Sequence, residues 1–209
     1  MITAEEALQR LQEGNRRFVE GMAQNHVLGL RDRRHELVAG QEPFAILLGC
    51  SDSRVPGEIV FDQGLGDLFV IRVAGNIVAP SHIGSIEFAA DRFGTRLVVV
   101  LGHSCCGAIE ATIDELERET GARSPNLRAI VDRIRPAVQG LLESDLRNDR
   151  EALMREAVRA NIRHSVDRLH YGSEILEHLI DKEGLMIVGA EYSLETGEVD
   201  FFYNLPVEE

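Results

Sequence analysis

Four short apolar runs alternate with longer stretches of helical periodicity along this chain, and this pattern constrains the fold most. The runs span residues 44–50, 67–73, 96–103 and 185–192. Apolar runs of this length, bounded by polar and turn-forming residues, are typical of strands buried on both faces of a sheet. Strands that alternate with helices predict βαβ units, and therefore an α/β fold with a mostly parallel sheet covered by helices on both faces.

Helices are predicted from apolar spacing and from capping residues, beginning with Thr3 as a suitable N-cap. The predicted helices span residues 3–20, 28–39, 82–93, 106–118, 125–143 and 149–180. The last of these is expected to break near Gly172. The tail at 198–204 follows a turn and predicts a hairpin with the run at 185–192, which adds an antiparallel edge strand to the sheet.

Length and composition favour a single folding unit. The chain has 209 residues, of which 44% are hydrophobic and 27% are charged. A chain of this size can bury a large core without disulfides. We therefore predict one domain over residues 1–209, with a central sheet of four mostly parallel strands plus the antiparallel edge strand. Residues 1–40 are predicted to form an N-terminal helical arm.

The charge balance excludes several classes of partner. The net charge of −13 argues against nucleic acid and anionic membranes, because both recruit basic patches. The apolar runs are far shorter than the roughly 20 residues of a membrane span. Acidic residues stand near the amino terminus where a secretory signal would have basic ones. We predict no nucleic-acid partner, no membrane partner and a cytoplasmic location.

Cysteine and histidine gather at the ends of two predicted strands. Cys50 ends the first strand, and His103 and Cys106 follow the third with a spacing of three residues. Thiolate and imidazole ligands favour Zn²⁺, and three protein ligands with one open position are typical of a catalytic zinc site. Cysteine is also among the most buried residue types, so a packed structural thiol is the alternative for Cys50.

An acid and a base follow Cys50 closely. Asp52 and Arg54 continue from it at a spacing of two, so all three side chains would share one face if the chain stays extended. A carboxylate held beside a metal site could orient or accept a proton. The alternative is an ordinary salt bridge in an exposed loop.

These motifs carry a family resemblance. The sequence CSDSR at 50–54, followed by GHSCCG at 102–107, resembles the C-x-D-x-R and H-x-x-C motifs of the β-class carbonic anhydrases. The stretches at 61–78 and 85–90 match the same family pattern, and the resemblance spans nearly the whole chain. It implies reversible hydration of carbon dioxide to bicarbonate and a proton by zinc-bound hydroxide.

The resemblance also implies a role for each matching residue. Cys50, His103 and Cys106 would ligate Zn²⁺, and Asp52 with Arg54 would form the catalytic dyad. Asp52 would displace water as the fourth zinc ligand in an inactive state. The implied substrate-binding residues are an orienting glutamine, an apolar wall, an aromatic residue and a backbone N–H donor: Gln41, Phe69 with Ala74, Phe88 and Gly107.

The family further implies assembly into a homodimer or a dimer-based tetramer, with the arm at residues 1–40 packing on the partner subunit. One rival function is hydrolysis of carbonyl sulfide or carbon disulfide at the same zinc site. Another is a non-catalytic zinc or thiol module, in which Cys105 and Cys106 act as a redox sensor. Otherwise Cys105 is expected to pack behind the site.

Overall fold

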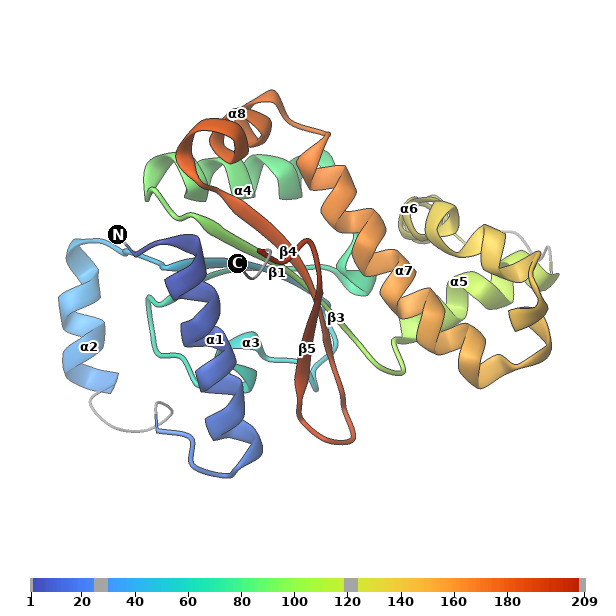
Figure 1. Cartoon of the computed structure of the whole chain (residues 1–209), viewed down its shortest axis with the longest axis horizontal. Helices are drawn as coiled ribbons and strands as arrows, with labels where there is room; N and C mark the ends of the chain where they lie inside the picture. Colours follow the sequence, from blue (N-terminus) through green and yellow to red (C-terminus); the bar gives the residue numbers. More distant parts are fainter. Residues whose placement is uncertain (1, 25–29, 119–123, 207–209) are drawn as a thin grey trace.

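A mixed sheet in the strand order β2-β1-β3-β4-β5 forms the centre of the protein (Figure 1). The computed structural model describes residues 2–24, 30–118 and 124–206. The strands are β1 (Ala45–Gly49), β2 (Leu68–Arg72), β3 (Leu97–His103), β4 (Met186–Tyr192) and β5 (Val199–Tyr203). Strands β1 to β4 run parallel, and β5 pairs antiparallel with β4. The predicted fold class is confirmed.

The helices lie between these strands close to their predicted positions. The α-helices are α1 (Ala4–Val19), α2 (Leu30–Glu36), α3 (Gly57–Val60), α4 (Pro80–Arg92), α5 (Gly107–Arg118), α6 (Pro125–Leu142), α7 (Arg150–His170) and α8 (Glu174–Glu183). The described residues also form the short 3₁₀ turns η1 (Leu37–Ala39), η2 (Ala74–Asn76) and η3 (Asp145–Asn148). Among the described residues, no helix combines the length and the apolar character that crossing a membrane requires.

Two helix boundaries and one short turn differ from the prediction or refine it. The stretch predicted as one helix over 28–39 begins outside the described residues and then divides into α2 and η1. The break near Gly172 is confirmed, because Ser173 accepts a hydrogen bond from the backbone N–H of Leu176 and starts α8 as a separate helix. Turn η2 was not predicted, and its Gly75 lies within hydrogen-bond distance of Cys50.

The core lies on both faces of the sheet. On one face, Val98 and Val100 of β3 belong to a buried cluster with helices α4 to α8. On the other face, Val99 and Leu101 belong to a second cluster that includes α1 and α3. Because successive strand side chains point to opposite faces, a continuous apolar run supplies both clusters at once. This explains why the strands lack polar alternation.

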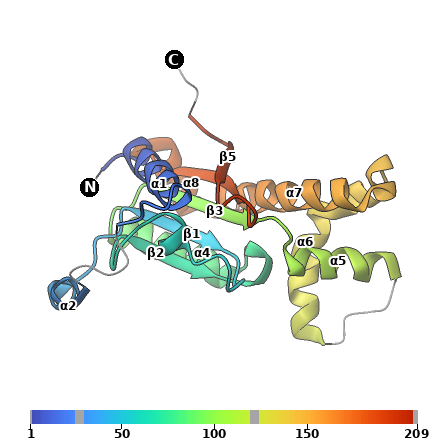
Figure 2. The same cartoon turned by 90° about the horizontal axis from the view of Figure 1, so that it is seen from below.

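Helix α1 is attached to its own sheet. Its N-terminus has a capping box, in which Thr3 and Glu6 exchange hydrogen bonds of 3.2 and 2.8 Å. The buried Asn15 donates to the carbonyl oxygens of Val60 and Gly197, at 3.1 and 2.9 Å. Helix α2 lies at the margin of the molecule, apart from the helical layers (Figures 1 and 2). Packing of residues 1–40 on a partner subunit stays a prediction.

A glycine on α1 gives a stability prediction. A Cβ at Gly14 would overlap the carbonyl oxygen of Phe61, whereas a Cβ at Gly140 of α6 would meet no atom within 4 Å. Gly14→Ala is expected to lower the free energy of unfolding by about 1–3 kcal/mol through overpacking. Gly140→Ala, the matched control, is expected to raise it by about 0.5–1 kcal/mol. Urea unfolding of both variants measures this, and equal effects would contradict the packing described.

Candidate metal centre and active site

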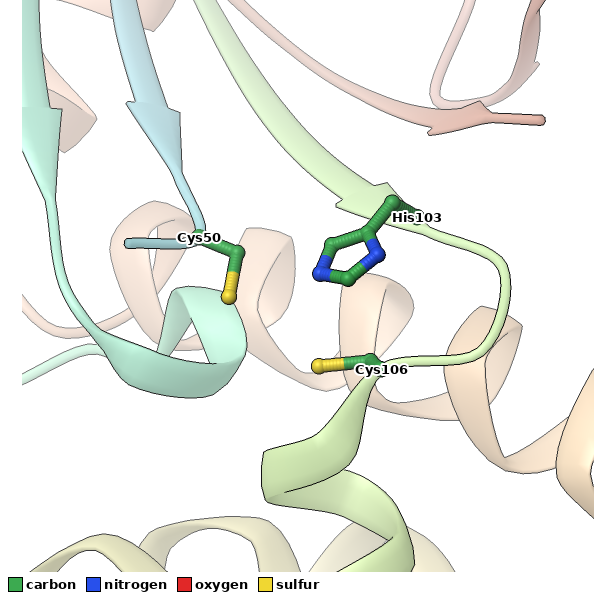
Figure 3. A group of neighbouring side chains, drawn as sticks. All are labelled: Cys50, His103 and Cys106. Atoms are coloured by element: carbon green, nitrogen blue, oxygen red, sulfur yellow. The ribbon is translucent and has the colours of Figure 1, made fainter. Parts of the chain in front are cut away.

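The cysteine and histidine side chains meet where the strand order reverses. The connection from β1 leads to β2 on one side, and the next connection crosses β1 to reach β3 on its other side. Ligand sites in open α/β sheets lie at such a switch point, outside the carboxyl ends of the strands. Cys50 directly follows β1 and His103 ends β3, while Cys106 directly precedes α5 (Figure 3).

The three side chains form a donor set suited to a metal. Their Sγ and ring nitrogen atoms lie within 4.8 Å of one another, and all three residues are buried. His103 Nδ1 lies 2.9 Å from the carbonyl oxygen of Ser104, which fixes the ring. Within the described parts of the chain, the buried His103 Nε2 has no hydrogen-bond partner. Two thiols and a free imidazole nitrogen fit Zn²⁺ with a fourth position open.

A tight turn brings His103 and Cys106 together. Ser104 is fixed on both sides, because its N–H donates to Tyr192 O at 3.0 Å and its Oγ accepts from the N–H of Leu194 at 3.0 Å. Cys105 has a left-handed φ of 55° and is exposed. The expectation that Cys105 packs behind the site is therefore wrong, because this turn directs it to the surface.

The two buried thiols are electrostatically unequal. The interaction with Cys106 lowers the pKa of Cys50; burial opposes this shift, and His103 and the Gly75 N–H add to it. The same interaction, together with burial, raises the pKa of Cys106. Burial lowers the pKa of His103, but the Cys50 thiolate outweighs it and leaves that pKa above its usual value. The cluster thus favours a thiolate at Cys50, the protonation state that binds metals.

Asp52 and Arg54 form a close ion pair beside the cluster. Arg54 Nε donates to Asp52 Oδ1 at 2.9 Å, and Arg54 Nη2 donates to Asp52 Oδ2 at 2.7 Å. Asp52 Oδ2 lies 3.8 Å from His103 Nε2. The Arg54 guanidinium holds the pKa of the Asp52 carboxyl well below its usual range. The carboxylate is therefore ionised and next to the metal donors.

The backbone geometry of this pair differs from the prediction. The chain does not stay extended after Cys50, because the N–H of Val55 donates to Asp52 O at 3.1 Å and closes a turn. The N–H of Arg54 also donates to Asp52 Oδ1, at 3.0 Å. A short turn, rather than a shared strand face, joins the two side chains.

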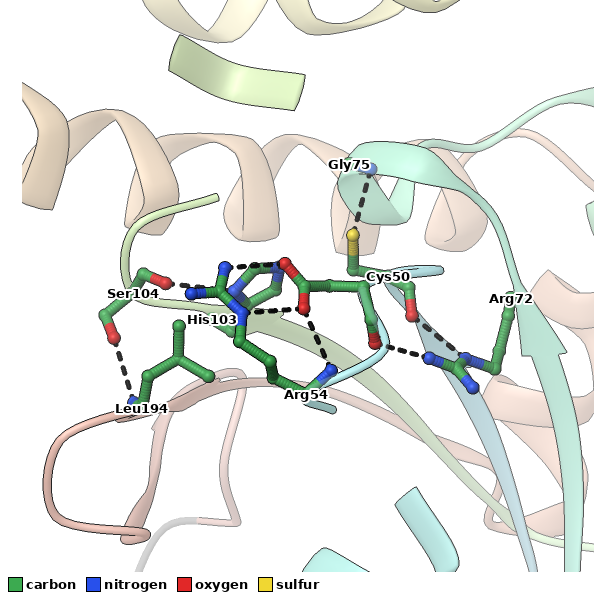
Figure 4. A network of polar contacts seen from close by, with 8 residues as sticks. Cys50, Arg54, Arg72, Gly75, His103, Ser104 and Leu194 are labelled. Atoms are coloured by element: carbon green, nitrogen blue, oxygen red, sulfur yellow. Dashed lines mark hydrogen bonds and ion pairs between the residues drawn. The ribbon is translucent and has the colours of Figure 1, made fainter. Parts of the chain in front are cut away.

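Two further residues contact this loop and were not predicted to do so. Arg72, at the end of β2, donates to Cys50 O at 3.0 Å and to Asp52 O at 2.6 Å (Figure 4). The N–H of Gly75 donates to Cys50 Sγ at 3.4 Å. The sequence gives little indication of the role of Arg72, because an arginine at the end of a strand has many possible hydrogen-bond partners. Only the pairing of β2 with β1 places Arg72 beside the loop.

The predicted substrate-binding residues divide into two groups. Ala74 and Gly107 are close to the cluster, since Ala74 precedes Gly75 and Gly107 follows Cys106. Gln41 precedes β1, at the opposite end of that strand from Cys50. Two aromatic residues, Phe69 and Phe88, also lie apart from the ligands of their own chain.

The positions of these aromatic rings follow from β2 and α4. Phe69 is paired with Ile46, which is four residues before Cys50 and hence about 13 Å along the strand. Phe88 is 53% exposed, with its ring centroid 6.3 Å from that of Phe69 and 5.6 Å from that of Phe93. One chain therefore does not bring Gln41, Phe69 or Phe88 to its own metal donors.

A cavity of about 860 Å³ opens beside the dyad. Arg54 and Cys105 line it at the site. Carboxylates line it elsewhere: Glu110, Glu151, Glu191 and Glu195. This cavity gives solvent access to the exposed side of the Asp52–Arg54 pair.

The fold and the site together define a class: an α/β protein with a Cys₂His cluster that could hold a metal ion at the switch point of its sheet, and a carboxylate–arginine pair beside it. The family model described as carbonic anhydrase matches residues 45–199. The chain belongs to the β-carbonic anhydrase family, as the resemblance implied, and is a β-carbonic anhydrase by that membership.

Individual relatives extend this similarity over most of the chain. Carbonic anhydrase 2 of Mycobacterium tuberculosis is 39% identical over 193 residues, which cover 91% of this chain and 89% of the relative. The carbonic anhydrase of Mycolicibacterium smegmatis is 37% identical, with coverages of 93% and 91%. The solved β-carbonic anhydrase CcaA is 28% identical, covers 96% and 93% of the two chains, and gives a TM-score of 0.72.

Proposed function

We propose that this chain catalyses the reversible hydration of CO₂ to bicarbonate and a proton, with one Zn²⁺ held by Cys50, His103 and Cys106. The observation that carries the proposal is the convergence of three buried donors within 4.8 Å of one another, with Asp52 Oδ2 at 3.8 Å from His103 Nε2. When bound, Zn²⁺ supplies a Lewis acid that makes a coordinated water acidic near neutral pH.

Asp52 orients the nucleophile in this proposal. Its Oδ1 accepts two hydrogen bonds from Arg54, whereas Oδ2 accepts one, from Arg54 Nη2, within the described parts of the chain. A carboxylate oxygen accepts at two positions, so Oδ2 retains acceptor capacity toward the neighbouring metal donors. Asp52 Oδ2 would accept a hydrogen bond from the attacking hydroxide. This bond would fix which lone pair of the hydroxide faces CO₂. Arg54 and Arg72 hold the loop in place.

Substrate binding combines apolar contact with hydrogen-bond donors. CO₂ is apolar, so an apolar wall suits it, and Ala74 supplies part of that wall next to the metal donors of its own chain. The N–H of Gly107 lies at the N-terminus of α5, where the helix dipole favours the charge that develops on bicarbonate. Gln41, Phe69 and Phe88 lie away from the ligands of their own chain, which supports their contribution by a second copy.

The proposed assembly is a homodimer or a dimer-based tetramer. Strand β2 is at one end of the strand order, so its outer edge has no strand partner within the described residues. The aromatic group formed by Phe69, Phe88 and Phe93 lies on β2 and next to it, with Phe88 largely exposed. Unpaired edges and exposed aromatic groups are features that a second subunit covers.

A charge at Phe88 tests this assembly. Phe88→Asp is expected to raise the dimer dissociation constant at least tenfold, roughly 1.4 kcal/mol, because it places a carboxylate in an apolar contact. Tyr171→Asp is the control, since Tyr171 is 74% exposed at the end of α7. Light scattering over a dilution series measures both variants. An unchanged assembly in Phe88→Asp would place the interface elsewhere.

The function itself is tested by comparing substrates on one zinc-loaded preparation. Stopped-flow measurement of CO₂ hydration is expected to show rapid turnover, far above the rate with carbonyl sulfide or carbon disulfide. Faster turnover of the sulfur compounds would support the rival hydrolase. Stoichiometric zinc without turnover of any of the three substrates would support a non-catalytic module.

A further inference from the structure

Turn η2 has an unusual backbone conformation that brings one N–H to the metal centre. Gly75 and Asn76 have successive left-handed φ angles of 72° and 41°. The positive φ favours glycine at position 75, and a Cβ there would lie 2.8 Å from Ile134 Cδ1, so Ile134 would also have to shift. This geometry directs the Gly75 N–H to Cys50 Sγ at 3.4 Å (Figure 4).

Helix α7 holds this turn by two hydrogen bonds. Asn161 Nδ2 donates to Gly75 O at 2.8 Å, and Ser165 Oγ donates to Asn76 O at 3.1 Å. Asn161 and Ser165 are four residues apart and so lie on the same face of the helix. Both are almost fully buried, at 0% and 2% exposure. Helix α7 thus supplies a matched pair of donors to consecutive carbonyl groups.

The side chain of Asn76 does not secure the turn. It is fully buried, and across the described ranges neither its Nδ2 nor its Oδ1 has a hydrogen-bond partner. A left-handed asparagine is often stabilised by its own side chain. Here that support is missing, so the turn is held by its own backbone bond from the Asn76 N–H to Val73 O, at 3.1 Å, and by the bonds from Asn161 and Ser165.

The same helix also contacts the strand that carries His103. A Cβ at Gly102 would lie 2.6 Å from Ile162 Cδ1, so α7 packs directly on the backbone just before His103. Ile162 lies between Asn161 and Ser165 in the sequence. One segment of α7 therefore supports turn η2 and the end of β3 together.

We propose that Asn161 and Ser165 are positioning residues of the metal centre, which lock turn η2 so that the Gly75 N–H donates to the Cys50 thiolate. The inference rests on the proposed function, because it requires Cys50 to ligate zinc. An N–H donor withdraws negative charge from a metal-bound sulfur, so the sulfur donates less charge and the metal keeps more of its Lewis acidity. The bond also fixes the direction of the sulfur lone pairs.

The test uses the full chain loaded with Zn²⁺ or Co²⁺. In Ser165→Ala and Asn161→Leu, the thiolate-to-cobalt charge-transfer band is expected to move to longer wavelength, because the sulfur electrons are less stabilised. Zinc affinity, measured by competition with a chromophoric chelator, is expected to fall about 10–100-fold, because the sulfur lone pairs are no longer held toward the metal. Ser165→Thr keeps the hydroxyl and is expected to restore the band.

The matched control is Thr95→Val. Thr95 is fully buried and donates its hydroxyl hydrogen bond to Pro43 O at 2.7 Å, just before β3 at the opposite end from His103. Loss of this hydrogen bond in Thr95→Val is expected to lower the free energy of unfolding. The thiolate-to-cobalt band and the zinc affinity are expected to stay unchanged. If Asn161→Leu does not fold, the comparison of Ser165→Ala, Ser165→Thr and Thr95→Val decides the question.

The outcomes separate this inference from the proposed function. A wild-type protein that binds zinc and shows the thiolate band, with Ser165→Ala indistinguishable from Thr95→Val, overturns the positioning role alone. A wild-type protein without zinc binding or without that band overturns the proposed metal centre. A band shift and weaker zinc binding confined to the α7 variants support the inference.

Discussion

Cys106→Ser is expected to remove zinc from the protein and to lower the rate of CO₂ hydration by at least about 1000-fold. Cys106 is 1% exposed and supplies one of the three clustered donors. A Lewis acid contributes several kcal/mol of transition-state stabilisation, and each 1.36 kcal/mol is tenfold in rate. Elemental analysis gives the zinc-to-protein ratio, and stopped-flow kinetics gives the rate.

The neighbouring cysteine provides the control for this substitution. Cys105 is exposed and its thiol lies outside the donor set. Cys105→Ser is therefore expected to keep zinc and activity. In the wild-type protein, dialysis against a zinc chelator should abolish activity, and added Zn²⁺ should restore it. Full activity in zinc-free protein would be incompatible with the proposed mechanism.

Asp52→Asn is expected to lower kcat/KM for CO₂ by about 10²–10⁴-fold, the usual range for a positioned acid or base. The amide keeps the shape of the side chain but loses its charge and half of its acceptor capacity. Because Asp52 is not among the three clustered donors, the zinc content should stay unchanged. Stopped-flow kinetics on protein of measured zinc content tests this.

Ser53→Ala is the control for the same loop, since Ser53 is exposed between the two dyad residues. It is expected to retain wild-type activity. If Asp52→Asn also retained it, the Asp52–Arg54 pair would be only a loop salt bridge. Higher activity in Asp52→Asn would instead show that Asp52 blocks the open zinc position in the resting protein, the inactive state that the resemblance implies.

The strands and the metal donors were predictable because they depend on local sequence. The run at 96–103 has no charged or polar side chain from Leu97 to Gly102, just before its final His, so both the buried strand and the residue at its end follow from one pattern. Parallel pairing of β1 and β3 then brings Cys50 and His103 to the same edge. Family motifs assign roles to these residues, but pairing in the sheet places them together.

The supports of the site were not predictable, because they join segments that are far apart in the chain. The bonds from Asn161 and Ser165 to turn η2 span 86 and 89 residues. Neither residue lies in a motif, and a buried polar residue on a helix has many possible acceptors. Cys105 was misplaced for a different reason, since its exposure depends on a left-handed backbone at a single position.

The unequal burial of the three cysteines makes thiol chemistry a simple gauge of the folded state. In native protein a colorimetric disulfide reagent should titrate one thiol per chain rapidly, because Cys105 is exposed while Cys50 and Cys106 are buried. In denaturant with a chelator, all three should react. The ratio of fast to total thiol then reports, without any substrate, what fraction of a preparation has an intact centre.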